Sequence, residues 1–201
     1  KNVADVDKIT KALLDKGVVQ SQDDIVNDHI AFRTLGVPNL GIASFEKIFQ
    51  AYGYVKRDYY YFEGKKLDAY WFSPPAEGYP RIFVSELRVK ELSQAAQDII
   101  YKYTSPITSD PVEDIDLSNG EEAAAFLQKP LWGLPTSEEY QTLLNESEYA
   151  AWVIYNRYYL NHYTISIHEL KDGYNTLEEF NDFLLSIGVK LNNSGGVIKT
   201  S

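Results

Sequence analysis

The chain has no cysteine among its 201 residues. This absence excludes both a disulfide framework and a thiolate-rich structural zinc site. A basic excess is also lacking, because the formal net charge is −10. Proteins that bind nucleic acids carry a basic footprint that neutralises phosphates, so we expect no nucleic-acid partner. Histidine is scarce, with three in the whole chain.

Long apolar runs are missing as well. No segment reaches the about 18 consecutive apolar residues that indicate a membrane span, and no signal-peptide pattern opens the chain. We therefore expect no membrane partner and a cytoplasmic location. The chain contains no methionine, and it stops at Ser201 just after the apolar pair Val197-Ile198, where a strand would begin. We expect the printed chain to be incomplete at this end.

Residues 28–90 fit a β-α-β-β-β unit. A helix is predicted to begin at the N-cap Ser44 and to stop at Gly53. The other segments alternate or are rich in aromatic residues, as strands are, and Glu63-Gly64 would turn the hairpin. These predicted strands cover residues 28–34, 54–62, 67–73 and 81–87.

The middle of the chain, residues 91–160, has helical patterns separated by prolines, which interrupt helices. We interpret it as a helical insertion packed on the sheet. The predicted helices cover residues 91–103, 120–128 and 137–158, and a further helical pattern covers residues 3–16.

Residues 161–201 repeat the opening pattern. A strand over 161–168 alternates polar and apolar residues, and Thr176 with Glu179 forms a capping box. The distance from His29 to the Ser44 cap is 15 residues, and that from His162 to the Thr176 cap is 14. We interpret 161–201 as the start of a second unit whose last strands are cut. The predicted fold class is α+β, with paired β-α-β-β-β units forming a curved sheet around a metal site.

His29 and His162 occupy equivalent places in the two units. If the units pair around a pseudo-twofold axis, the two imidazoles meet near it. Neutral imidazole binds Fe, Zn, Cu and Ni, and one added carboxylate gives a site that leaves positions open for substrate and O₂. Either histidine alone is more simply explained as a structural residue. Their equivalence across the repeat favours a shared metal.

Arg33 shares a strand face with His29, because residues i, i+2 and i+4 point the same way. It lies roughly 13 Å along the strand, which leaves room for a small acid between the metal and the guanidinium. A guanidinium binds a carboxylate through two parallel hydrogen bonds. A surface ion pair would explain Arg33 equally well.

Four other residues are candidates for the pocket or for support of the metal ligands. Thr164, Ser166 and His168 share a predicted strand face with His162. Glu86 closes the first unit and could face the metal. The simpler interpretations are a structural role for His168 and a hydrogen-bonded carboxylate at a strand end for Glu86.

Three segments, residues 27–34, 83–87 and 161–164, resemble the 2-oxoadipate dioxygenase/decarboxylase family. The resemblance runs from about residue 5 to the chain end. The first segment is the most specific, because it fixes His and Arg four positions apart. The resemblance implies a relation to the vicinal oxygen chelate fold, which is built from paired β-α-β-β-β units.

The resemblance also implies Fe(II) held by two histidines and a glutamate, with an arginine that binds substrate. His29 and His162 match the two histidines, and Arg33 matches the arginine. The glutamate is expected beyond Ser201. Zinc or another divalent metal could occupy the isolated protein. The implied reaction converts 2-oxoadipate and O₂ to 2-hydroxyglutarate and CO₂, a step in lysine breakdown.

Two other classes of function stay open on the sequence alone. The scaffold could carry an O₂-independent metal-dependent hydrolase, lyase or isomerase, since a fold does not fix a function. It could also be a protein that binds a small acid without turnover. The oxygenase depends on Fe(II) and O₂, whereas these two classes do not, so this dependence distinguishes them.

Overall fold

The computed structural model describes residues 4–193 and residue 198. Most of the strand expected after residue 196 lies outside the described residues. The chain divides into two compact units: residues 29–163 form the larger, and residues 1–28 with 164–201 form the smaller.

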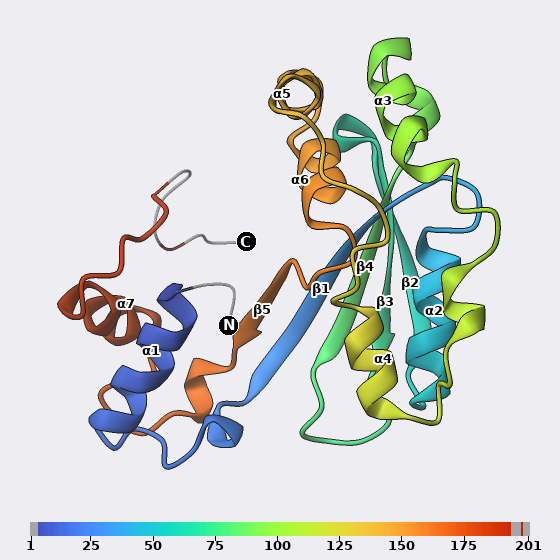
Figure 1. Cartoon of the computed structure of the whole chain (residues 1–201). Coiled ribbons are helices and arrows are strands. Elements are labelled where there is room, and N and C mark those ends of the chain that lie inside the picture. Colours follow the sequence, from blue (N-terminus) through green and yellow to red (C-terminus); the bar gives the residue numbers. More distant parts are fainter. Residues whose placement is uncertain (1–3, 194–197, 199–201) are drawn as a thin grey trace. The chain divides into compact units, whose positions relative to one another are not determined.

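A mixed five-stranded sheet forms the framework of the larger unit (Figure 1). The order across the sheet is β2-β3-β4-β1-β5. β1 and β4 run parallel, whereas β2, β3 and β4 form an antiparallel meander. The strands span Asn27–Leu35 (β1), Val55–Phe62 (β2), Leu67–Ser73 (β3), Arg81–Leu87 (β4) and His162–Ile165 (β5).

The chain order β1-α2-β2-β3-β4 is the predicted β-α-β-β-β unit, so that part of the prediction is confirmed. The predicted helix over 137–158 is two helices, because Ser147 adopts an extended backbone and its side chain caps the second one. The helices of this unit span Ile42–Ala51 (α2), Gln94–Thr104 (α3), Gly120–Phe126 (α4), Ser137–Glu146 (α5) and Glu148–Asn156 (α6), and 3-10 turns span Glu63–Lys65, Val89–Glu91 and Pro111–Asp114.

The core of the larger unit lies on the face of the sheet that α2 covers (Figure 1). The ring of Phe32 lies 5.2 Å from that of Phe45 and 5.4 Å from that of Phe49, measured between centroids. Since neighbouring residues of a strand point to opposite faces, His29 and Arg33 lie on the other face of β1. A buried apolar layer thus supports the candidate site from behind.

The start of α2 differs from the prediction. The helix begins at Ile42 after Gly41, and Ser44 lies inside it, buried and donating a hydrogen bond to Asp110 (2.7 Å). Glu86 provides the cap instead, because its carboxylate accepts a hydrogen bond from the Ile42 N–H (2.8 Å). Gly41 has φ 94°, and a Cβ there would collide with the Glu86 carboxylate, so only glycine fits.

The smaller unit packs two helices around Leu13, Val18, Val19, Leu170 and Phe183. These helices are α1 (Ala4–Asp15) and α7 (Leu177–Ser186), and 3-10 turns span Gln22–Asp24 and Ile167–Glu169. The predicted cap of α7 is confirmed, because the Thr176 hydroxyl accepts a hydrogen bond from the Glu179 N–H (3.2 Å). In the described part of the chain, no helix combines the length and apolar character that crossing a membrane requires.

The division into a first unit (28–90), an insertion (91–160) and a second unit (161–201) stays a prediction. The two compact units group the chain differently, since residues 29–163 combine the first predicted unit with the insertion.

Glu86 makes stability depend on pH. Burial raises the pKa of this carboxyl above its ordinary 4.5. The hydrogen bond from the Ile42 N–H and the charge of Lys56 lower the pKa, whereas the charge of Asp68 raises it. A carboxyl whose pKa rises on folding stabilises the fold most below its ordinary pKa, and this contribution is lost as the pH rises through the raised value. We expect Glu86→Gln, which keeps an acceptor for Ile42, to gain stability relative to wild type as the pH rises from 4 to 7.

Urea unfolding at several pH values measures this difference in the free energy of unfolding. Glu77→Gln, which neutralises an exposed loop carboxylate, is the matched control and should show no such trend. A difference between Glu86→Gln and wild type that stays constant with pH would contradict the prediction.

Candidate metal centre

The structure brings His29 and His162 together within the larger unit. Their ring centroids lie 5.7 Å apart, with an angle of 85° between the ring planes. β1 carries His29, and its neighbour β5 begins at His162. The Asn161 N–H donates to the Ala31 carbonyl (3.0 Å), which fixes the register of the two segments. The edge of the Phe83 ring also packs against His29, at 5.3 Å between centroids.

Asn161 orients the His162 ring. Its Oδ1 accepts a hydrogen bond from Arg33 Nε (3.0 Å) and lies 3.1 Å from His162 Nδ1. A guanidinium nitrogen can only donate, so the amide atom that it meets is the oxygen. His162 Nδ1 must then donate to the same oxygen, which leaves the Nε2 lone pair available as a metal ligand.

The electrostatic surroundings of His162 favour the neutral imidazole. Partial desolvation lowers its pKa, and electrostatic interaction with the neighbouring His29 and Arg33 lowers it further. Metals bind imidazole only in its neutral form. The same surroundings therefore disfavour protonation of His162, which would compete with metal binding.

Arg33 is held on several sides. Its Nε is bound by Asn161, and its Nη1 donates to both oxygens of Glu148, at 3.1 and 3.2 Å. Its central carbon lies 5.0 Å from the ring centroid of Tyr149 and 5.2 Å from that of Trp152. These distances allow cation–π attraction to both rings. The result is a guanidinium with a fixed orientation near the two histidines.

The two histidines fit one metal ion by distance. An imidazole nitrogen lies about 2 Å from a bound metal, so two rings on one ion have centres no more than roughly 6 Å apart. The observed 5.7 Å lies within this limit. Among the described residues, no group of three His, Asp or Glu side chains is arranged to hold a metal. The structure thus brings together two candidate nitrogen ligands, and among the described residues no carboxylate completes a group of three with them.

The other predicted pocket residues have the following surroundings. Glu86 is on the opposite face of the sheet from His29, where it caps α2. The strand β5 ends at Ile165 and a 3-10 turn follows, so the predicted shared face does not extend to Ser166 or His168. Ser166 is buried, and its N–H donates to Val26 (2.8 Å). His168 is exposed and lies 3.4 Å from Glu169. Thr164 is half-buried within β5.

Four neighbours of the site had no functional role in the sequence analysis: Asn161, Glu148, Tyr149 and Trp152. Asn161 had a local signal, because it directly precedes His162. Glu148 and Trp152 are four residues apart and so share a helix face. Nothing in the sequence places that face over Arg33, since 115 residues separate Arg33 from Glu148.

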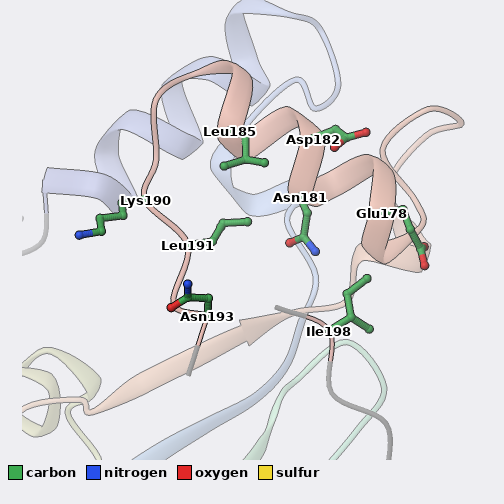
Figure 2. A pocket seen from close by; sticks show the side chains of 8 residues that line it. All are labelled: Glu178, Asn181, Asp182, Leu185, Lys190, Leu191, Asn193 and Ile198. Atoms are coloured by element: carbon green, nitrogen blue, oxygen red, sulfur yellow. The ribbon is translucent and has the colours of Figure 1, made fainter. Parts of the chain in front are cut away.

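An open hollow lies in the smaller unit (Figure 2). Its volume is about 630 Å³. No histidine and no predicted site residue lines it. Its lining includes the apolar Leu185, Leu191 and Ile198 and the charged Glu178, Asp182 and Lys190.

The mixed sheet and its helices define an α+β protein of the glyoxalase-like fold. A structure from Ralstonia eutropha, described as that of a glyoxalase superfamily protein, matches the fold with a TM-score of 0.73 and 20% identity. The match covers 96% of this chain and 63% of the Ralstonia chain. More particularly, the chain belongs to the 2-oxoadipate dioxygenase/decarboxylase family, whose model matches residues 1–201. The predicted family and fold class are confirmed.

Two relatives show how much of a family protein the chain represents. It is 42% identical to the chloroplastic 2-oxoadipate dioxygenase/decarboxylase of Arabidopsis thaliana, over 92% of the chain and 51% of that protein. The structure of hydroxyglutarate synthase from Oryza sativa, in complex with 2-oxoadipate, matches with a TM-score of 0.77 and 39% identity. This match covers 98% of the present chain and 67% of the rice chain. The chain thus spans about half the length of the curated relative.

The hydrogen bond to Asn161 predicts the tautomer of His162. In the metal-free protein we expect the neutral ring to carry its proton mainly on Nδ1, as ¹⁵N chemical shifts of the imidazole would show. Asn161→Ala removes the acceptor, so the Nδ1-protonated population should fall. Asn161→Asp keeps an oxygen in the same place and should retain that population. An unchanged tautomer in Asn161→Ala would show that Asn161 does not orient the ring.

Proposed function

We propose that the protein holds a divalent metal, Fe(II), with His29 and His162 and uses it with O₂ on 2-oxoadipate. The observation that carries this proposal is the 5.7 Å approach of the two imidazoles, with Arg33 bound to the same Asn161 that orients His162. Membership of the family supports the choice of reaction. The 2-oxoadipate in the rice structure supports the choice of substrate.

Each residue of the site has one task in this proposal. His29 and His162 Nε2 supply two neutral nitrogen ligands, and the desolvation that lowers the pKa of His162 keeps it in that form. When bound, Fe(II) would supply electrons and a Lewis acid for oxidative decarboxylation at the 2-oxo acid group. Asn161 holds the ring of His162 in the orientation that presents Nε2.

Arg33 binds the distal carboxylate of the substrate. It lies four residues from His29 on the same face of β1, roughly 13 Å along the strand, and its long side chain can reach back toward the metal. The aromatic rings of Tyr149 and Trp152 and the bond to Asn161 fix its orientation. A fixed guanidinium favours an acid that carries a carboxylate at each end, and so favours a dicarboxylic over a monocarboxylic 2-oxo acid.

The proposed reaction converts one 2-oxoadipate and one O₂ to one 2-hydroxyglutarate and one CO₂. Both oxygen atoms of O₂ enter the products, so the atoms balance without another reductant. Fe(II), as opposed to zinc, is part of the proposal because O₂ chemistry needs a redox-active metal. A cytoplasmic location also stays a proposal, since the name of the Arabidopsis relative places that protein in the chloroplast.

O₂ consumption tests the reaction directly. After anaerobic reconstitution with Fe(II), we expect the protein to take up O₂ when 2-oxoadipate is added and to release CO₂ in equal amount. Zinc-loaded protein and His29→Ala serve as controls and should show neither. Metal-loaded protein that binds 2-oxoadipate without O₂ uptake would contradict the proposal and favour an O₂-independent enzyme or a binding protein.

Metal binding tests the ligand assignment separately from turnover. We expect His29→Ala and His162→Ala each to lose stoichiometric iron, whereas Arg33→Ala keeps it and loses affinity for the acid about tenfold or more. Asn161→Ala should weaken metal binding about 10- to 100-fold, because it releases the His162 ring. Titration calorimetry and the metal content per chain measure these effects. Stoichiometric iron in either histidine variant would rule out that residue as a ligand.

A further inference from the structure

Arg33 already binds a carboxylate of its own chain. Its Nη1 donates to both oxygens of Glu148, the first residue of α6. Under the proposed function, this guanidinium is also the group that receives the distal carboxylate of the substrate. Two carboxylates thus compete for one cation.

Arg33 has several contacts besides the one with Glu148. Asn161 binds Nε, and the rings of Tyr149 and Trp152 lie 5.0 and 5.2 Å from the guanidinium carbon. With all of these contacts and Glu148 in place, the Arg33 side chain is 23% exposed. Removing Glu148 would therefore leave the guanidinium in place and expose the edge that Glu148 covers.

Glu148, in contrast, is held loosely. Its side chain is 64% exposed. Both of its oxygens share the single Nη1 at 3.1 and 3.2 Å, which is weaker than two parallel bonds to two nitrogens. The N-terminus of α6 does not need this side chain as a cap, because the Ser147 hydroxyl accepts the hydrogen bond from Ala150 (3.1 Å). An exposed ion pair of this kind contributes at most about 1 kcal/mol, so an incoming carboxylate can displace it.

We propose that Glu148 is a specificity-determining residue that occupies the substrate-carboxylate position on Arg33 and must be displaced when a dicarboxylic 2-oxo acid binds. This inference rests on the proposed function. It assigns Glu148 two effects on such an acid. The Glu148 carboxylate covers the Arg33 guanidinium, and it repels the negative charge of the approaching acid. A monocarboxylic acid of the same length does not need the Arg33 edge and is insensitive to both.

The sign of one substitution distinguishes this role from the alternative. If Glu148 merely positioned Arg33, Glu148→Gln would weaken the binding of a dicarboxylic acid. If Glu148 competes, the same substitution strengthens it. The loss of an exposed ion pair corresponds to about two- to fivefold tighter binding.

The experiment is anaerobic titration calorimetry of the Fe(II)-loaded protein with 2-oxoadipate and with 2-oxohexanoate, which lacks the distal carboxylate. Glu148→Gln should bind 2-oxoadipate about two- to fivefold more tightly and 2-oxohexanoate with unchanged affinity. Glu77→Gln makes the same change in net charge at an exposed loop and should leave both affinities unchanged. Weaker or unchanged binding of 2-oxoadipate to Glu148→Gln would overturn the proposal, as would an equal gain for both acids.

Arg33→Ala separates this proposal from the proposed function. If Arg33→Ala keeps the wild-type affinity for 2-oxoadipate, Arg33 does not bind substrate and the assigned site is wrong. If Arg33→Ala loses affinity and Glu148→Gln does not gain it, the site stands and the role of Glu148 is refuted. If neither wild type nor Glu148→Gln binds 2-oxoadipate, Glu148 is not what keeps the acid from Arg33, and the role is refuted as well.

Discussion

The site depends on how Asn161 is bound. Its backbone N–H donates to the Ala31 carbonyl, which places His162 beside His29, and its side-chain oxygen accepts hydrogen bonds from Arg33 and His162. One residue therefore sets the register between two segments more than a hundred positions apart and orients both the imidazole of His162 and the guanidinium of Arg33. A shift of one residue would turn His162 to the other face of the sheet.

Alternate residues of β1 face opposite sides of the sheet, one side packed in the core and the other carrying the candidate site. Its inward residues, such as Phe32, pack against the aromatic rings of α2, and its outward residues include His29 and Arg33. Because the inward layer is buried and tightly packed, the backbone under the outward residues is rigid. Glu86 belongs to the inward side, where it caps α2 and closes the space that Gly41 leaves open. That position explains why a carboxylate on the strand that pairs with β1 does not face His29.

Local patterns in the sequence predicted the order of strands and helices and the two histidines that meet. The strands and helices depend on alternation and caps, which are local, and the two histidines were matched by their equivalent places in the two units of a repeat. The start of α2 was predicted wrongly because its cap comes from Glu86, 44 residues away. The strand after His162 was predicted too long, because its alternating residues continue into a 3-10 turn. The surroundings of Arg33 depend on how α6 packs, which no local pattern specifies.

The charges around the candidate site bear on which acid it would bind. The chain carries a net charge of −10, yet the face that holds His29, Arg33 and His162 combines a guanidinium with an imidazole whose lowered pKa keeps it neutral. In the proposed function a divalent metal adds two positive charges there, and Glu148 offsets one charge of the metal-free site. In that proposal a dianionic substrate would displace Glu148 and bind Arg33 through its distal carboxylate, with its 2-oxo acid end toward His29 and His162. The spacing between the two histidines and Arg33 would then discriminate by the distance between the carboxylates of an acid, whereas the exposed Glu148 would weaken the binding of an acid that carries a second carboxylate.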